Sequence, residues 1–396
     1  MNYKRVYFQT LKNRISQPRK FIQAITGPRQ VGKTTLAQQL CNEIAIPYLY
    51  VTADNVPVAD DIWIEQQWEA ARIQLKNATQ YEFLIIIDEV QKVKNWSEII
   101  KKLWDTDSFN NTNLKVILLG SSSLMLQQGL HESLAGRFEL IKIPHWSFSE
   151  MHDCFGMNEE QYAWFGGYPG SFPLLNEEDR WKEYIRNALI ESTISKDVLM
   201  LTQINKPALL RQVFEMGVHY SAQILSYTKM LGQLQEAGNT TTIAHYLHIL
   251  DTAGLIMGIP KYFKEIYREK ASSPKWQVKN TALISALSHE YFDEVQKDLV
   301  KWGQIVESTI GSHLINKAEE GNYKVYYWRY RNEEVDYVLQ KGDKIIGIEV
   351  KSGQSRPTKG MATFKAKYTP YKLLLVGTSG LHWKEFLKLN PETLFE

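Results

Sequence analysis

The stretch GPRQVGKTT, residues 27–35, follows the apolar run FIQAIT at 21–26 and precedes an amphipathic stretch at 33–43. It matches the phosphate-binding pattern G-x-x-x-x-G-K-[ST] in full, between an apolar run and a helical pattern as that motif requires. Glycines let backbone amides approach phosphate, and the N-terminus of a helix favours negative charge. The sequence therefore predicts an ATP site at the end of a β-strand.

Two side chains of this loop have roles of their own. Lys33 is expected to reach the β- and γ-phosphates, and Thr34 is expected to ligate Mg²⁺. ATP and Mg²⁺ are therefore the expected cofactors. The residues predicted to contact the nucleotide are Gly27, Pro28, Arg29, Gln30, Val31, Gly32, Lys33, Thr34 and Thr35.

A second apolar run, FLIIIDEVQ at 83–91, ends in two acids. Asp88 lies where a strand would end, and it is expected to hold the Mg²⁺, in part through water. Glu89 is expected to orient or deprotonate the attacking water. The alternative is a strand that merely ends in a capping pair of acids.

Two further residues are predicted to serve catalysis. Ser121 follows the apolar run KVILLG at 115–120, and we expect its side chain beside the γ-phosphate, with helix N-capping as the alternative. Arg137 follows a glycine just before another strand-like run. It is expected to stabilise transition-state charge on the ATP of a neighbouring subunit, with an ordinary surface arginine as the alternative.

Apolar runs and helical patterns alternate from about residue 20 to 145, which predicts a P-loop NTPase fold of the α/β class with a parallel sheet. A chain of 396 residues exceeds the usual size of one core. We predict an AAA-type ATPase domain at 1–150, a helical lid or linker at 151–215, a winged-helix-like module at 216–265 and a small α/β nuclease-like domain at 266–396.

The middle of the chain predicts a winged helix-turn-helix. Apolar residues indicate one helix within 225–234, a threonine-capped helix follows at 240–250, and the run at 255–263 is interpreted as a hairpin wing. Such a module lays its second helix in the major groove of DNA. Only His245 and His248 are candidate basic residues on that helix, so a protein–protein module stays an alternative.

Three acids and a lysine mark the C-terminal part. Glu307 lies in a helical pattern, Asp336 lies in one strand-like run, and Glu349 and Lys351 share one face of the next run. Converging carboxylates are suited to Mg²⁺ or Mn²⁺, and the lysine to positioning water or stabilising a pentavalent phosphate. A surface ion pair between Lys351 and an acid is the alternative.

The order of these residues resembles that of the PD-(D/E)xK nuclease-like superfamily, although Val335 stands where the superfamily's proline would precede Asp336. The resemblance implies a nuclease-like fold, and such domains either cleave DNA or only bind it or other subunits. A basic stretch at 358–367 would lie where related domains contact the DNA backbone. The aromatic residues at 323–330 are interpreted as core rather than as a base-stacking surface.

Composition adds few constraints. Lys and Arg total 46 and Asp and Glu total 44, so the net charge of +2 does not by itself indicate a nucleic-acid binder. Residues 1–42 and 351–372 contain no acids and are suited to contact phosphate, or are solvated surface.

Two cysteines without metal-ligand spacing fit a reducing compartment. The chain shows neither a signal-peptide pattern nor an apolar run long enough for a bilayer. We expect a cytoplasmic protein with no membrane contact.

The motifs GPRQVGKTT, LIIIDEVQ, LLGSSS, LAGR and FGGYP together resemble predicted AAA-superfamily ATPases of bacteria and archaea that carry a C-terminal domain of unknown function. The resemblance places Arg137 at an arginine-finger position, which implies a homo-oligomer that is a ring or another head-to-tail assembly. We expect an ATP-hydrolysing motor or switch that acts on DNA. The alternatives are a regulatory ATPase with a protein partner and an ATP-dependent, metal-requiring nuclease.

Overall fold

The chain folds into two compact units, residues 1–144 and 145–396, in a computed structural model. The structure describes residues 3–56, 62–77, 81–120, 129–130, 132–199, 204, 206–234, 239–264, 272–351 and 359–396. Within those residues no helix is long and apolar enough to cross a bilayer. The boundaries of the four domains predicted from the sequence stay predictions.

A parallel five-stranded sheet with the order β2-β3-β4-β1-β5 forms the centre of the first unit. Every neighbouring pair of strands is parallel, which confirms the predicted α/β sheet. All residues of β1, β3 and β4 are buried, because helices cover both faces of the sheet. The strands are β1 (Ile22–Thr26), β2 (Tyr48–Thr52), β3 (Phe83–Asp88), β4 (Leu114–Gly120) and β5 (Phe138–Lys142).

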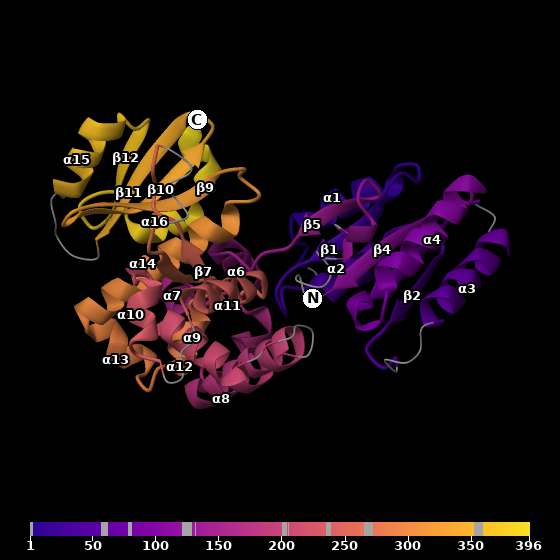
Figure 1. Cartoon of the computed structure of the whole chain (residues 1–396), viewed down its shortest axis with the longest axis horizontal. Helices are drawn as coiled ribbons and strands as arrows, with labels where there is room; N and C mark the ends of the chain where they lie inside the picture. Colours follow the sequence, from indigo (N-terminus) through magenta and orange to yellow (C-terminus); the bar gives the residue numbers. More distant parts are fainter. Residues whose placement is uncertain are drawn as a thin grey trace. The chain divides into compact units, whose positions relative to one another are not determined.

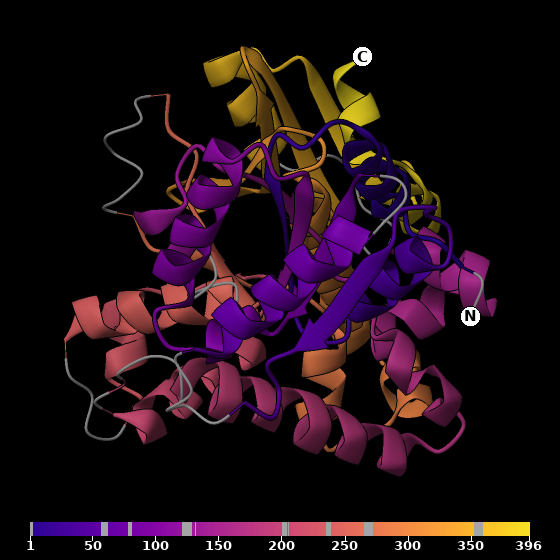
Figure 2. The ribbon, with the colours of Figure 1, turned by 90° about the vertical axis from the view of Figure 1, so that its right-hand side faces the viewer.

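Two hydrophobic layers hold helices on opposite faces of this sheet. On one face, α1 (Tyr7–Ser16) and α2 (Lys33–Cys41) pack on alternate residues of the strands. On the other face lie α3 (Trp63–Asn77) and α4 (Trp96–Phe109). Figure 1 shows both layers, and Figure 2 shows them after a quarter turn. Because the strands alternate their side chains between the two faces, each apolar run contributes to both layers.

The first half of the second unit is mainly helical, as the sequence pattern predicts. Its elements are α6 (Phe148–Phe155), α7 (Glu159–Phe165), η2 (Pro169–Leu174), α8 (Glu178–Glu183), wide π-type turns η3 (Tyr184–Glu191) and η4 (Thr193–Leu199), α9 (Pro207–His219), α10 (Tyr227–Leu231) and α11 (Thr240–Thr252). Helices α12 (Ala282–Leu287), α13 (Phe292–Lys297) and α14 (Leu299–Lys317) follow.

A small antiparallel sheet with the order β6-β8-β7 lies among α9, α10 and α11. Its strands are β6 (Gln223–Ile224), β7 (Ile256–Ile259) and β8 (Lys275–Val278). One expectation for this region was wrong. The hairpin predicted within 255–263 does not form: β7 pairs with β8, and Pro260, which has no N–H to donate, ends the strand. A helix does form within 225–234, and it begins after Ser226, whose hydroxyl accepts a hydrogen bond from Lys229 N.

The C-terminal sheet has the order β12-β11-β10-β9. Strands β9 (Lys324–Tyr330), β10 (Glu333–Lys341) and β11 (Lys344–Lys351) form the predicted antiparallel meander, and β12 (Lys372–Gly377) adds in parallel. Helix α15 (Lys359–Tyr368) packs on β9, β10 and β11, while α14 and α16 (Trp383–Lys388) pack on β11 and β12, and η6 (Pro391–Phe395) ends the chain (Figure 1). Most aromatic side chains of 323–330 are buried, as expected, and Tyr330 is exposed.

His313 provides a test of the packing between α14 and α16. Its ring is buried, lies edge-on to Phe386, and its Nε2 is 3.1 Å from the carbonyl oxygen of Leu389. Burial, and to a smaller extent the charge of Lys317, lowers the pKa of His313 from 6.5 to about 4. The folded protein therefore keeps this ring neutral at a pH where the unfolded chain protonates it.

We expect the free energy of unfolding to fall as the pH drops from about 6.5 to about 4, because the unfolded state then binds more protons at His313. The full contribution is about 3 kcal/mol. Urea unfolding at several pH values, compared with His313→Gln, measures it. If wild type and His313→Gln lost the same free energy of unfolding between pH 6.5 and pH 4, the lowered pKa given to His313 would be contradicted.

Candidate nucleotide site and C-terminal acidic cluster

The predicted P-loop joins the end of β1 at Thr26 to the start of α2 at Lys33. Both of its glycines are required by geometry. A Cβ atom on Gly27 would lie 2.2 Å from the carbonyl oxygen of Ile143, and Gly32 has a φ of 93° at the N-cap of α2. The loop therefore has the close backbone approach and the helix start that a phosphate site needs.

Lys33 is buried, and its Nζ donates to the carbonyl oxygens of Gly27 at 2.9 Å and Pro28 at 2.8 Å. Its ammonium thus lies over the loop that would hold the phosphates. Val31 is also buried, and its carbonyl oxygen accepts a hydrogen bond of 3.0 Å from Arg5 Nη1. Thr34 and Thr35 are exposed in the first turn of α2, next to this loop.

Asp88 at the end of β3 meets the P-loop helix directly. Thr34 Oγ1 donates to Asp88 Oδ2 at 2.9 Å, and the hydroxyl of Tyr50 donates to the same oxygen at 2.6 Å. Burial, followed by the carboxylate of Asp88, raises the pKa of Tyr50, so this phenol stays a donor. The hydroxyl and the carboxylate form an oxygen donor set of the kind that Mg²⁺ prefers.

Glu89 directly follows Asp88 and has an uncommon left-handed backbone, with a φ of 53°. Its backbone N–H donates to Asp88 Oδ1 at 2.9 Å, and its Oε2 accepts from Gln91 Nε2 at 2.6 Å. The two acids therefore point apart, one toward Thr34 and the other held by Gln91. Such local strain is common at functional sites.

The remaining predicted catalytic residues lie elsewhere. Ser121 falls outside the described residues. Arg137 makes a bidentate ion pair with Asp105, at 2.7 and 2.9 Å. Its carbonyl oxygen accepts from Ile22 N at 2.9 Å, where β1 and β5 begin in parallel. Arg137 therefore lies at the opposite edge of the sheet from the P-loop of its own chain.

In the second unit, the four predicted residues of the nuclease-like site come from three elements. Glu307 lies on α14, Asp336 on β10, and Glu349 and Lys351 on β11. Lys351 Nζ is 3.1 Å from Glu349 Oε1, and Asp336 Oδ2 accepts from the backbone N–H of Val350 at 2.8 Å. Burial alone would lower the pKa of Lys351, but Asp336 and Glu349 raise it above its ordinary value.

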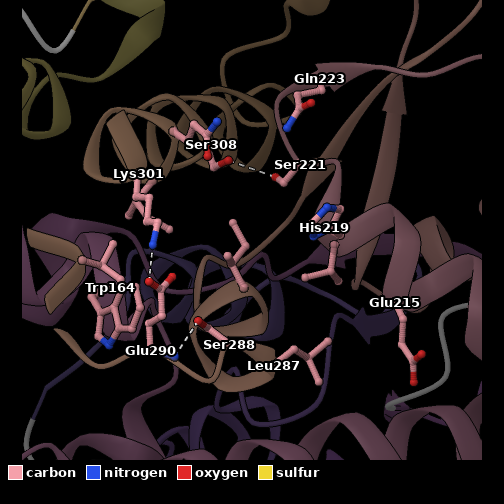
Figure 3. A pocket seen from close by; sticks show the side chains of 15 residues that line it. Trp164, Glu215, His219, Ser221, Gln223, Leu287, Ser288, Glu290, Lys301 and Ser308 are labelled. Atoms are coloured by element: carbon pink, nitrogen blue, oxygen red, sulfur yellow. Dashed lines mark hydrogen bonds and ion pairs between the residues drawn. The ribbon is translucent and has the colours of Figure 1, made fainter. Parts of the chain in front are cut away.

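A cavity of about 580 Å³ opens elsewhere in this unit. Figure 3 shows Lys301 paired with Glu290 and the hydroxyl of Ser308 donating to that of Ser221 at 3.0 Å. Apolar side chains such as Leu287 complete the wall. Its volume is typical of small-molecule sites, but none of the residues predicted from the sequence lines it.

Sequence reasoning missed three residues that support these sites. Tyr50 could have been found, because it is a polar residue near the end of a predicted strand. Arg5 lies in an acid-free stretch, and nothing else in the sequence indicates that it contacts the P-loop. Lys275 was also missed. It is fully buried, and its Nζ lies 2.8 Å from Glu307 Oε1. A single lysine in a short run after Pro274 does not indicate such a position.

Three consecutive segments of the chain match three different protein families. Residues 19–152 match the family described as "AAA domain". The match supports an AAA-superfamily ATPase. Residues 158–292 and 302–384 match two families described as "Domain of unknown function", DUF8612 and DUF4143.

Similar proteins span most of the chain. An uncharacterized protein of Mycobacterium tuberculosis is 26% identical over 337 residues, which cover 83% of this chain and 69% of that protein. An uncharacterized protein of Haemophilus influenzae is 22% identical, covering 83% of this chain and 82% of that one. The Walker-type ATPase of Pyrococcus abyssi, a solved structure, is 12% identical with a TM-score of 0.49, covering 72% of this chain and 96% of that chain.

We expect Tyr50→Phe to lower kcat/KM for ATP by roughly tenfold. The carboxylate of Asp88 would lose the hydrogen bond that the Tyr50 hydroxyl donates to it, and a hydrogen bond to a charged group is worth about 1.5 kcal/mol. Tyr48→Phe is the matched control, since Tyr48 lies two residues earlier on β2 and is partly exposed. Steady-state ATP hydrolysis measures both variants. Unchanged kinetics in Tyr50→Phe, or equal losses in the two, would refute the role given to Tyr50.

Proposed function

We propose that the chain is a Mg²⁺-dependent ATPase that works on DNA as a head-to-tail homo-oligomer. The hydrogen bond between Thr34 and Asp88 carries the ATPase part of this proposal. It joins the two predicted motifs, which are more than fifty residues apart in sequence, at the phosphate-binding loop. ATP hydrolysis measured with and without DNA distinguishes this function from the alternative expected from the sequence, a switch with a protein partner.

Each residue of the site then has one task. Lys33 exchanges the carbonyl oxygens of Gly27 and Pro28 for phosphate oxygens when ATP binds. Thr34 and Asp88 would hold Mg²⁺, which would supply positive charge against the phosphates. Glu89 accepts a hydrogen bond from the attacking water and takes its proton. For these roles, Lys33 must leave the two carbonyl oxygens of the loop, and Glu89 must leave the side-chain amide of Gln91.

The position of Arg137 supports an assembly of several chains. It lies at the sheet edge opposite the P-loop, so it cannot reach the ATP of its own chain. A head-to-tail contact brings such a residue to the next chain's nucleotide, as arginine fingers do. The ion pair with Asp105 holds the guanidinium at the surface until a neighbour's phosphates compete for it.

A basic patch of the second unit supports DNA as the partner. We define the basic patch as Lys261, Arg329, Arg331 and Lys367 around the exposed ring of Tyr330. The ring centroid of Tyr330 is 4.9 Å from Lys367 Nζ and 5.3 Å from Arg331 Cζ. Partial burial, together with the charges of Lys367 and Arg329, lowers the pKa of Lys261. Clustered like charges gain from a phosphate backbone, and an exposed ring can stack on a base.

The arrangement around the small sheet also supports a DNA-binding role. Its chain order is α9, β6, α10, α11, β7 and β8, with β8 between the other two strands. This order agrees with a winged helix, in which α11 would be the groove-facing helix. The residues exposed on α11, Thr241, His245 and His248, are uncharged or weakly basic. Contacts to the DNA backbone, rather than base reading, therefore fit this module best.

ATP hydrolysis measured with and without duplex, single-stranded, forked and four-way-junction DNA tests this proposal. We expect at least one DNA shape to stimulate turnover, and Lys33→Ala to abolish it. The double substitution Arg331→Glu and Lys367→Glu should remove the DNA-dependent part, because repulsion replaces about two phosphate contacts.

Lys297→Glu is the matched control, since this exposed lysine on α13 belongs to the same unit but not to the basic patch. It should keep DNA stimulation. Turnover that responds to none of the four DNA shapes would reject DNA and favour a protein partner. Turnover that survives Lys33→Ala would reject the ATP site itself.

We expect Arg137→Ala to reduce ATP turnover on the order of a thousandfold while nucleotide binding is retained. Mixing Arg137→Ala chains with Lys33→Ala chains should restore part of the activity, because some interfaces then combine an intact Lys33 with an intact Arg137. Full activity of Arg137→Ala alone, or mixtures no more active than their parts, would argue against a finger acting between chains.

A further inference from the structure

A buried lysine lies among the acids of the nuclease-like cluster. Lys275 on β8 has no exposed surface. Its Nζ lies 2.8 Å from Glu307 Oε1 and 3.2 Å from the carbonyl oxygen of Asp336. It is also 3.8 Å from Asp336 Oδ1 and from Glu334 Oε1, and 4.6 Å from the ring centroid of Tyr337. The ammonium therefore faces three carboxylates and the face of an aromatic ring.

The charges around Lys275 keep it protonated. Burial alone would lower its pKa, but Glu307, Asp336 and Glu334 together raise it above the ordinary value for lysine. Burial, together with the neighbouring carboxylates, nevertheless raises the pKa of Glu307 and that of Glu334. The charge of Lys275, with smaller contributions from Arg329 and Lys351 at Glu334, thus stabilises several acids that would otherwise repel each other.

The nuclease-like resemblance implies a divalent metal between these same acids, and the residues present do not fit one. Two ammonium groups already lie among these acids: that of Lys275 is 2.8 Å from Glu307 Oε1 and 3.8 Å from Asp336 Oδ1, and that of Lys351 is 3.1 Å from Glu349 Oε1. A dication placed between them would be repelled by both, and most strongly by the fully buried Lys275.

We propose that Lys275 is the resident cation of this acidic cluster, so that the cluster joins β8, α14 and β10 and takes no divalent metal. The second unit then holds DNA or a partner without cutting it. Lys351 fits this account, because its ammonium neutralises Glu349 at the edge of the same cluster. The proposal concerns the second unit alone and stands whether or not the first unit hydrolyses ATP.

The first test counts bound Mn²⁺ by electron paramagnetic resonance, in the full chain without nucleotide. We expect wild type and Asp336→Asn to bind the same number of ions, because the acidic cluster holds none. Loss of one ion per chain in Asp336→Asn would overturn the proposal. This result needs no activity of either unit.

The second test removes the internal cation. Lys275→Met should lower the melting temperature by about 10 °C, because the buried Asp336 and the partly buried Glu307 and Glu334 lose their counter-charge. Millimolar Mn²⁺ should then recover much of that loss, since the vacated position accepts a dication. Wild type should gain nothing comparable from Mn²⁺.

Lys182→Met is the matched control, because Lys182 is also buried but bonds mainly to the carbonyl oxygen of Glu290 and lies 3.5 Å from one acid, Glu178. It should destabilise the chain without recovery by Mn²⁺. Equal stability of Lys275→Met and wild type would overturn the proposal. So would a response of Lys275→Met to Mn²⁺ no greater than that of Lys182→Met.

Discussion

The parallel pairing of β1 with β4, and of β4 with β3, is the constraint on which the nucleotide site depends. Parallel strands end at the same edge of a sheet, so the P-loop after β1 and Asp88 at the end of β3 meet there, although β4 lies between them. The hydrogen bond from Thr34 to Asp88 then fixes the first turn of α2 against β3. Because β5 is parallel to β1, Arg137, which directly precedes β5, lies at the opposite edge of the sheet.

Two buried lysines show how different surroundings give one side chain different uses. Lys33 bonds to carbonyl oxygens of a loop, neutral groups that phosphate oxygens can replace at little cost. Lys275 bonds to carboxylates on separate elements, and removing it would leave buried charges uncompensated. The first lysine is therefore suited to exchange its partners during a reaction, and the second is suited to hold a structure together.

The sequence predicted most of the first unit because its signals are local. Continuous apolar runs identified the buried strands, and a loop pattern with fixed spacing identified the P-loop. Contacts between distant segments were not predictable in this way. Nothing near Lys275 indicates that its partners lie on α14 and β10, and the pairing of β7 with β8 depends on a strand that the hairpin interpretation did not include. Tyr50 is an intermediate case, since its strand was predicted but its contact with Asp88 was not.

A crystal structure with a non-hydrolysable ATP analogue and Mg²⁺ would show whether the loop after β1 binds the nucleotide. We expect one nucleotide per chain, with its phosphates in the loop of residues 27–35. We also expect Lys33 Nζ to leave the carbonyl oxygens of Gly27 and Pro28 for the phosphates, and the metal to lie beside Thr34 and Asp88. A nucleotide bound elsewhere, or a Lys33 that keeps both carbonyl contacts while the nucleotide is bound, would refute the proposed ATP site.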